Sequence, residues 1–343
     1  MWRNSMNPET LDWLLEENNP GVRVRTLTGL CGLANDHAEV VAARDLVVHT
    51  LGQARDLSWM EDTRPLPPIY GLTALAETGL TRDSAPTDPV VDRLLGQFRD
   101  VNCGDFIFLR ALAMLGYGTD PRFNDCLARI AETQLPDGGW LCLHRVNKMN
   151  RTPKSCIKAN MHALLLAGEM TKRGLPFAGR DGLVGYFLKR RLFYRTGDPN
   201  RLVLDCRPGF RMIDAYFPIE IQRVGLPLLL DAFAALGVGG APELSGAWEI
   251  LRTKQDEHGR VKLEGTLAKS YLPKERVGRP GKWVTLYALL AHKAALPMDK
   301  YSPEWVAEFL LSNAVNNEDY LEAAARVRSM GLNPDAIPHI QPE

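Results

Sequence analysis

The sequence lacks an excess of charge of either sign and lacks a long apolar run. It contains 41 acidic residues and 41 lysines and arginines, so its formal net charge is zero. A protein that binds nucleic acid mainly through phosphates carries a basic excess, which this chain does not have. The amino-terminal residues form no apolar signal segment, and no run of 18 apolar residues occurs. These features predict a cytoplasmic protein with no integral membrane segment and no nucleic-acid partner.

Cysteines and strand patterns are also sparse. The 6 cysteines are scattered without the spacing of a disulfide scaffold, so we expect reduced thiols. No stretch alternates apolar and polar residues for long enough to predict a sheet. Because 45% of the residues are hydrophobic, the chain can still bury a large core, which we expect to be helical.

A short phrase that begins with glutamine recurs along the chain. Its copies are Gln53-x-x-Asp56-x-x-Trp59, Gln97-x-x-Asp100, Gln134-x-x-Asp137-Gly138-Gly139-Trp140 and Gln255-x-x-His258-Gly259-x-Val261. The first two glutamines are 44 residues apart, the next interval is 37, and the last gap of 121 equals about three such units. A period of about 40 residues is typical of arrays of supersecondary units, each too small to bury its own apolar face.

Each unit is predicted to be a helical hairpin. The first helix ends near the glutamine, and the glycines after Asp137 supply the positive backbone angles for a sharp exit. The Gln134 amide can satisfy backbone groups at the helix end, while Trp140 packs across the turn. We expect about six or seven hairpins, with helices over 8–17 with 20–33, 36–52 with 67–79, 88–100 with 103–116, 120–134 with 155–171, 180–192 with 216–236, 241–255 with 281–296, and 303–312 with 317–329. They predict a single all-α domain over 1–332 and a carboxyl-terminal tail over 333–343.

The phrase at 134–140 resembles the QW repeat of squalene and oxidosqualene cyclases, which belong to the superfamily of terpenoid cyclases and protein prenyltransferase β-subunits. The resemblance covers roughly residues 36–296. The chain is also similar to bacterial proteins called squalene-cyclase-like or prenyltransferase-like, in segments 19–23, 137–142, 155–157, 255–260 and 282–286. The resemblance implies an α/α toroid, a double-layered ring of helical hairpins, whereas the period alone also suits an open solenoid. It leaves the reaction open.

The catalytic signatures of that superfamily are missing from the sequence. There is no Asp-x-Asp-Asp segment, as squalene-type cyclases use, and no Asp-Asp-x-x-Asp magnesium site. Asp205-Cys206 is nearest to the Asp-x-Cys zinc pattern of prenyltransferase β-subunits, but adjacent side chains diverge. Asp205 and Asp214 remain as candidate general acids, and the apolar neighbours of Asp214 would favour its protonated form.

A polar line on the predicted helix 155–170 supplies a further candidate for catalysis. Ser155, Lys158, His162 and Glu169 follow helical spacing, so they point the same way. If this helix faces a central cavity, His162 is a plausible acid or base. If it is an outer helix, the line is its wet face.

Long loops at the predicted rim of the ring are rich in cations. They would suit the diphosphate or carboxylate head of a ligand, because helix N-termini at the rim also favour anions. The candidate ligands are Lys154, Lys158, Arg195, Arg279 and Lys282. Trp140, Trp283 and Tyr216 are the aromatics expected to contact the apolar part of the substrate or to stabilise a carbocation. The alternative is that the cations are solvated and that the aromatics are core residues.

Three cysteines are predicted near the starts of inner helices, hence at one rim. Cys103, Cys142 and Cys156, with Asp105 or His144 as a further ligand, could bind zinc. No Cys-x-x-Cys pair supports this site, and cysteine is also a common core residue.

Two functions from different classes follow from these observations. The first is a cyclase-like protein, a non-standard cyclase or transferase, whose cavity takes a hydrophobic or isoprenoid ligand with an anionic head. The second is a non-catalytic toroid that binds a lipid, peptide or protein partner. Zinc-dependent thiolate chemistry on a small molecule is a third reading. The sequence leaves the oligomeric state open.

Overall fold

The computed structural model describes residues 7–54, 58–98, 103–142, 155–267, 270–295, 311, 317–329 and 332–337. Contacts divide the chain into two compact units, one of residues 7–295 and one that combines 1–6 with 296–343. The domain boundary that the sequence places at residue 332 stays a prediction. The contacts divide the chain near residue 296.

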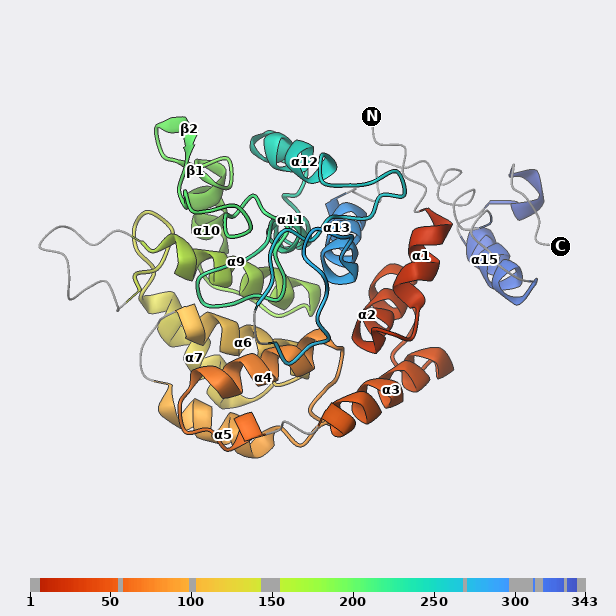
Figure 1. Ribbon diagram of the computed structural model, residues 1–343, viewed down its shortest axis with the longest axis horizontal. Coiled ribbons are helices and arrows are strands. Elements are labelled where there is room, and N and C mark those ends of the chain that lie inside the picture. The colour runs from red at the N-terminus through yellow and green to blue at the C-terminus, as the bar shows by residue number, and fades with distance from the viewer. Residues whose placement is uncertain are drawn as a thin grey trace, which may run out of the picture. The chain divides into compact units, whose positions relative to one another are not determined.

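The larger unit consists mainly of helices joined by loops (Figure 1). The helices are α1 Pro8–Leu15, α2 Pro20–Arg25, the π-helix η1 Thr26–Leu30, α3 Ala38–Ala54, the 3₁₀-helix η2 Ser58–Met60, α4 Leu66–Glu77, α5 Asp88–Gln97, α6 Cys103–Leu115, α7 Pro121–Glu132, α9 Ile157–Lys172, α10 Arg180–Leu188, α11 Leu226–Ala235, the 3₁₀-helix η3 Pro242–Leu244, α12 Ser245–Arg252 and α13 Lys282–Ala295. Prolines begin α1, α2 and α7, where their missing N–H has no partner to lose.

The smaller unit contains α15 Asn317–Ser329 and the 3₁₀-helix η5 Pro334–Ala336. Leu311, Ala324 and Val327 form its buried cluster, against which Tyr320 and Leu332 pack. The predicted helix at 303–312 falls almost entirely outside the described residues.

The expectation of a helical chain holds for most described residues, and one short hairpin departs from it. Strands β1 Tyr194–Arg195 and β2 Asp198–Leu202 pair antiparallel. Gly197 lies in the turn at φ 83°, a backbone conformation that favours glycine. The strands were missed because they are too short to show an alternating pattern.

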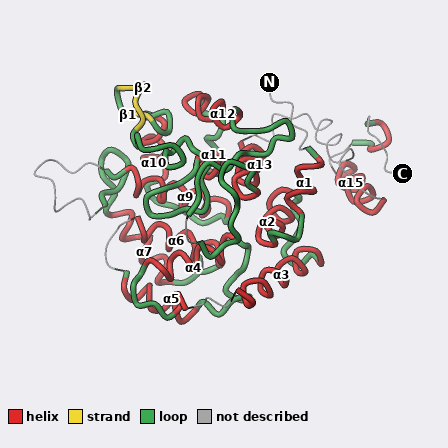
Figure 2. The backbone as a smooth tube through the Cα atoms, in the orientation of Figure 1, coloured by secondary structure: helices red, strands yellow, loops and turns green. Residues whose placement is uncertain are grey.

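The predicted helix over 216–236 is wrong in its first half. Helix α11 begins at Leu226, with proline at its first turn, and the residues before it form a loop (Figure 2). Pro218 has no N–H for a helical ladder. The backbone at Gly225 also lies directly against that of Tyr216, since a Cβ atom there would lie 2.2 Å from the Tyr216 carbonyl oxygen. The apolar composition of the segment therefore reflects a buried loop.

Every second helix of the larger unit contacts the next one of the same set. Helices α4, α6, α9, α11 and α13 are in contact in that order, and α13 contacts α2. Helix α2 in turn meets the end of α4, since a Cβ atom on Gly21 would lie 2.8 Å from the Thr78 side chain. Helix α3 packs on α2, α10 on α9 and α12 on α11.

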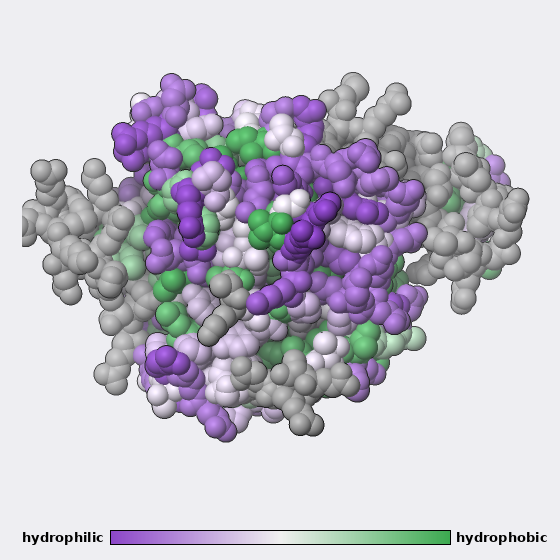
Figure 3. Space-filling view, in the orientation of Figure 1, coloured by the Kyte–Doolittle hydropathy of each residue, from purple (hydrophilic) through white to green (hydrophobic). Residues whose placement is uncertain are grey.

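The helices of this contacting set are apolar on nearly all sides. In α6 every residue except Asp105 is buried, whereas α7 buries only Phe123, Cys126 and Ile130 on one face. A helix that is apolar all round lies inside a protein, and an amphipathic one lies at its surface. The view in Figure 3 shows a largely hydrophilic face with small hydrophobic areas. Within the described part of the chain, no helix is both long enough and apolar enough to span a bilayer.

The interior also holds charged groups that no sequence pattern predicted. The Arg110 guanidinium of α6 donates to Glu77 of α4 over 2.6 Å and to the Tyr287 hydroxyl of α13 over 3.1 Å. Tyr287 donates to the second oxygen of Glu77. The Glu77 side chain is 0% exposed and that of Arg110 4%. These bonds join three helices that are distant in sequence.

Candidate metal centre

Three thiols that belong to separate parts of the sequence meet at one point. The sulfur atoms of Cys103, Cys142 and Cys156 all lie within 4.8 Å of one another. Cys103 is the first residue of α6, and Cys156 is the N-cap of α9. Cys103 and Cys156 are each 4% exposed, while Cys142 is half-buried. Among the described residues, Cys142 is thus the most exposed of the three thiols.

The glutamine phrase holds the chain in the position that Cys142 requires. The Gln134 amide donates to the carbonyl oxygens of Gly138, over 2.9 Å, and of Gly179, over 2.8 Å. The Trp140 N–H donates to the Asn160 side chain of α9 over 2.8 Å. The phrase thus ties the segment after α7 to two other segments. The Gln134 amide bonds to carbonyls of the turn and of the α10 N-cap, and not to the last carbonyls of α7 as predicted.

The returning segment is fixed to the same turn. The N–H of Cys156 donates to the carbonyl oxygen of Trp140 over 2.7 Å, and the Ser155 hydroxyl donates to Asp137 over 2.6 Å. At Gly138, φ is 89° and a Cβ atom would lie 2.0 Å from a neighbouring carbonyl oxygen. Only glycine fits there, so the turn and both flanking cysteines have little freedom.

The same set of hydrogen bonds surrounds the glutamine phrase at 255–261. The Gln255 amide donates to the Gly259 carbonyl over 3.3 Å, and the Val261 N–H donates to the Thr285 hydroxyl over 2.8 Å. The N–H of Gly281 donates to the Val261 carbonyl over 2.9 Å. By these bonds Val261 corresponds to Trp140, and Gly281 corresponds to Cys156.

The correspondence shows that this turn does not need thiols. Leu263 lies two residues after Val261, as Cys142 lies two residues after Trp140, so Leu263 is equivalent to Cys142. Gly281 is equivalent to Cys156. The second turn forms the same bonds without sulfur. The backbone geometry of this turn therefore does not require cysteine at 142 or 156.

The surroundings of Cys103 disfavour its ionised form when no cation is present. A hydrogen bond with Cys156, burial, and the nearby Cys156 and Cys142 sulfurs raise the pKa of Cys103 above its usual range. Two helix N-termini, those of α6 and α9, point their positive ends at the cluster. A divalent cation would neutralise the remaining repulsion between thiolates.

The spacing of the sulfurs suits a tetrahedral ion. Zinc–sulfur bonds of about 2.3 Å place two sulfurs of a tetrahedron about 3.8 Å apart, within the 4.8 Å limit of the cluster. Among the described residues this cluster consists of the three thiols alone, and Asp105 is not part of it. His144 lies outside the described residues.

The loop before α11 bonds to polar groups of α4 and α9. The Tyr70 hydroxyl accepts a hydrogen bond from the Ile221 N–H over 3.0 Å, and Lys158 donates to Gln222 over 3.3 Å. Burial chiefly raises the pKa of Tyr70, the Glu220 carboxylate adds to the effect, and the Cys103 thiol lies close enough that its ionised form would add to it as well. The loop 220–222 thus lies over α4 and α9, with Tyr70 close to Cys103.

His162 is enclosed beneath the same loop. Its side chain is 1% exposed, and neither ring nitrogen has a hydrogen bond. Burial lowers the pKa of His162 to about 4, although the backbone of Ile221 and Glu220 opposes the shift. The imidazole is therefore neutral at pH 7. The prediction that it acts as an acid or base stays a prediction.

The two predicted acids lie in different surroundings. Asp214 is buried, and it accepts hydrogen bonds from the Arg211 guanidinium, at 2.8 Å, and from the Arg211 N–H, at 2.7 Å. A carboxylate with its lone pairs so occupied stabilises a turn and is poorly placed to deliver a proton. Asp205 is exposed in the segment after β2.

The predicted cationic ligands do not gather at one place in the described residues. Arg195 of β1 and Arg279 are exposed, and Lys154 lies outside the described residues. Lys282 is 6% exposed and donates to Glu16 over 2.8 Å and to Asn18 over 2.6 Å. Lys282 therefore joins α13 to the segment between α1 and α2. Lys158 donates to Gln222 over 3.3 Å, and its role in ligand binding stays a prediction.

The predicted aromatic residues are all buried. The Trp140 indole donates to the Ile130 carbonyl over 2.8 Å and packs against Phe106, which makes it a structural residue. The Tyr216 hydroxyl has no hydrogen-bond partner, and burial raises the pKa of Tyr216 to about 12. Trp283 stacks on Phe217 at 4.8 Å between ring centres.

No family model, curated protein or solved structure matches this chain. The proposed function therefore rests on the geometry of this chain's own residues.

Proposed function

We propose that this chain is a zinc protein whose metal is bound by Cys103, Cys142 and Cys156, with a fourth position left for a small-molecule substrate. The observation that carries the proposal is the meeting of three thiols that the backbone does not require. Three thiolates are a soft ligand set, which selects zinc over hard cations such as magnesium. Catalytic zinc sites typically have three protein ligands and one exchangeable position.

Zinc in this site would supply a Lewis acid that lowers the pKa of a bound water or substrate thiol, so that it loses its proton to solvent near neutral pH. The chain's own groups would position that substrate. Lys158, two residues after Cys156 on α9, donates to Gln222 over 3.3 Å and offers a charged donor. Tyr70 offers a hydroxyl whose proton remains bound because its pKa is raised. The reaction class that fits this set is thiolate chemistry on a small anionic molecule.

For the scaffold, we propose the α/α toroid that the QW-like phrase implies. The contacts of α2, α4, α6, α9, α11 and α13 in cyclic order support it. The equivalent hydrogen bonds around Gln134 and Gln255 support a repeated unit. In such a ring the N-termini of α6 and α9 would lie at the same rim, which accounts for the meeting of Cys103 and Cys156.

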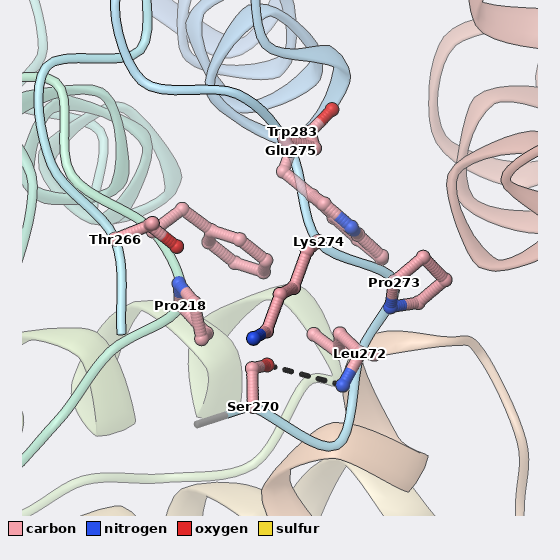
Figure 4. A pocket seen from close by; sticks show the side chains of 9 residues that line it. Pro218, Thr266, Ser270, Leu272, Pro273, Lys274, Glu275 and Trp283 are labelled. Carbon is pink, nitrogen blue, oxygen red and sulfur yellow. Dashed lines mark hydrogen bonds between the residues drawn. The ribbon is translucent and has the colours of Figure 1, made fainter. Parts of the chain in front are cut away.

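The terpenoid-cyclase-like function stays a prediction. A pocket beside Trp283 (Figure 4) has a cavity volume of about 10 Å³, room for about one water molecule. Ligand pockets usually hold about 300–1,000 Å³. This pocket therefore gives the isoprenoid ligand no support.

The test is the zinc content of the purified protein and of single cysteine variants. We expect about one zinc per chain in the wild-type protein. The zinc affinity should fall at least about tenfold in each of Cys103→Ser, Cys142→Ser and Cys156→Ser. Cys126→Ser is the matched control, because Cys126 is also buried but lies outside the cluster. Zinc that persists in all three variants, or that is absent from the wild-type protein under zinc-replete expression, would refute the proposal.

A cobalt-substituted protein distinguishes a catalytic site from a closed structural one. An open fourth position predicts that added 2-mercaptoethanol binds cobalt and shifts its visible absorption. A site closed by a fourth protein ligand would leave the spectrum unchanged. That result would favour the non-catalytic toroid.

A further inference from the structure

The three thiols of the cluster differ in how far solvent reaches them. Cys103 and Cys156, at the starts of α6 and α9, are each 4% exposed, whereas Cys142 is half-buried. An oxidant attacks a cysteine only where it can reach the sulfur. Among the described residues of the cluster, Cys142 is therefore the thiol most open to oxidation.

The cluster can convert a first oxidation into a disulfide. All three sulfur atoms lie within 4.8 Å of one another. A disulfide bond is about 2.05 Å long, so two of these sulfurs have to approach by about 3 Å at most. A change of one χ1 rotamer carries a cysteine sulfur by about 3 Å. The required movement is thus within the range of a side-chain rotation.

The backbone holds Cys142 near the other sulfurs without using any thiol. The Trp140 N–H donates to the Asn160 side chain over 2.8 Å, and the Cys156 N–H donates to the Trp140 carbonyl over 2.7 Å. Neither bond involves sulfur, so loss of a metal leaves both in place. A reactive group held in this way meets its partner at a high effective concentration.

The other cysteines provide a natural comparison. In the described part of the chain, the cluster contains none of Cys31, Cys126 and Cys206. Cys31 and Cys206 are exposed, and Cys126 is buried with its sulfur 3.6 Å from the Arg129 guanidinium. A peroxide that oxidises a cysteine outside the cluster produces a sulfenic or higher acid, since no cluster thiol is there to resolve it.

We propose that Cys142 is a site of reversible oxidation by peroxides, which joins it in a disulfide to Cys103 or Cys156 and thereby releases the zinc. The release of zinc rests on the proposed function, whereas the disulfide does not. Two of the three metal ligands are lost in one reaction, and the remaining thiol is a single ligand.

The reaction with hydrogen peroxide balances in two steps. The Cys142 thiolate attacks one peroxide oxygen, the O–O bond breaks, hydroxide leaves, and Cys142 becomes a sulfenic acid. The second thiolate then attacks the Cys142 sulfur, the S–S bond forms, the S–O bond breaks, and a second hydroxide leaves. The two thiolates lose two electrons in total, and the peroxide gains them.

The disulfide would switch off the proposed thiolate chemistry until it is reduced. The third cysteine of the cluster stays a thiol, and an added dithiol returns the other two to the reduced form by thiol–disulfide exchange. Because the turn at 134–140 keeps its hydrogen bonds, the reduced cluster can bind zinc again. The proposal thus assigns the cluster a redox control of its own metal.

The test adds hydrogen peroxide to the zinc-loaded protein in a Cys31→Ser/Cys206→Ser background, which removes the two exposed thiols outside the cluster. A chromogenic chelator follows zinc release, and mass spectrometry after alkylation maps the products. We expect about one zinc released per disulfide and a mass loss of about 2 Da per chain. A cross-linked peptide should contain Cys142, and dithiothreitol with added zinc should restore the zinc content.

Single variants in the same background, all compared in the presence of a chelator, show which thiol reacts first. Cys142→Ser should form the Cys103–Cys156 disulfide at least about tenfold more slowly than the parent, because both sulfurs are shielded from solvent. Cys103→Ser and Cys156→Ser each keep Cys142 and one partner, so their rates should lie within about threefold of the parent. Cys126→Ser is the control and should change nothing.

Three outcomes would overturn the proposal. All three cluster cysteines remain reduced in a peroxide excess of about tenfold. The disulfide forms as fast in Cys142→Ser as in the parent. Cys142 is oxidised to a sulfinic acid that dithiothreitol does not reverse. Absence of zinc from the starting protein would refute the proposed function alone, because mapping of the disulfide needs no metal. Zinc bound by the three cysteines without disulfide formation would refute the oxidation proposal alone.

Discussion

Replacing Arg110 by methionine tests whether the buried charges hold the helices of the larger unit together. The Arg110 guanidinium donates to Glu77 over 2.6 Å and to Tyr287 over 3.1 Å, so it joins α6 to α4 and α13. Methionine has a similar reach and keeps most of the apolar packing. The substitution leaves the Glu77 carboxylate, with its side chain 0% exposed, without its counter-charge.

The expected loss is large for one side chain. Removal of one partner of a buried ion pair typically costs about 3–5 kcal/mol, because an uncompensated charge remains inside the protein. Tyr287 still donates to Glu77, which places the expected loss near the lower end, about 3 kcal/mol. Urea unfolding followed by circular dichroism measures the change in the free energy of unfolding.

A double variant separates the charge effect from the packing effect. Glu77→Gln combined with Arg110→Met removes both charges, so it should be less destabilised than the sum of the two single variants by about 1–3 kcal/mol. An Arg110→Met protein within about 1 kcal/mol of the wild type would refute the reasoning, as would strict additivity in the double variant.

Three further predictions concern pH, a surface tether and the glutamine phrase. Glu169 is 5% exposed, and although its burial acts to raise its pKa, Lys172, Arg173 and other cations lower that pKa to about 2. Because the pKa of Glu169 falls from 4.5 to about 2, its ionised form stabilises the fold by about 3 kcal/mol. This contribution is present above pH 4.5 and is lost as the pH falls toward 2. Urea unfolding between pH 7 and pH 3 should show this loss, with a smaller slope below pH 4.5 in Glu169→Gln. Lys282→Met should destabilise the chain by about 1–2 kcal/mol, because it loses the bonds of the Lys282 ammonium to Glu16 and Asn18; a stability equal to the wild type would contradict the structural role of Lys282. Gln134→Ala should cost about 1–3 kcal/mol and weaken zinc binding, because it releases the turn that carries Cys142; unchanged zinc affinity would show that the turn does not position the thiol.

Much of the helical pattern could be predicted from the sequence. The helices expected at 103–116 and 155–171 correspond to α6 and α9, because their apolar periodicity and their flanking turn residues agree. The helix expected at 216–236 failed in its first half, since a buried loop and a buried helix have the same apolar composition. A pattern of hydrophobic residues reports burial more reliably than it reports backbone conformation.

The thiol cluster could be predicted only in outline. The three cysteines were expected at one rim because each lies near the start of a predicted inner helix, and the structure brings their sulfurs within 4.8 Å. Their mutual distance depends on the hydrogen bonds of Trp140 to Asn160 and to Cys156, which no spacing reveals.

Other parts of the interior gave no sequence signal. Arg110 lies 33 residues from Glu77 and 177 from Tyr287, so their ion-pair network depends on tertiary contacts alone. The pocket at Trp283 likewise needs two loops that are separated by all of α11 and α12. A single sequence cannot report which distant loops share a wall.

X-ray absorption at the zinc edge tests the central claim most directly, because it counts the atoms bound to the metal in the purified protein. The account predicts three sulfurs at about 2.3 Å and one lighter atom at about 2.0 Å. It also predicts one fewer sulfur, or no bound zinc, in Cys142→Ser. Zinc surrounded only by nitrogen and oxygen, or a sulfur count unchanged in that variant, would contradict it.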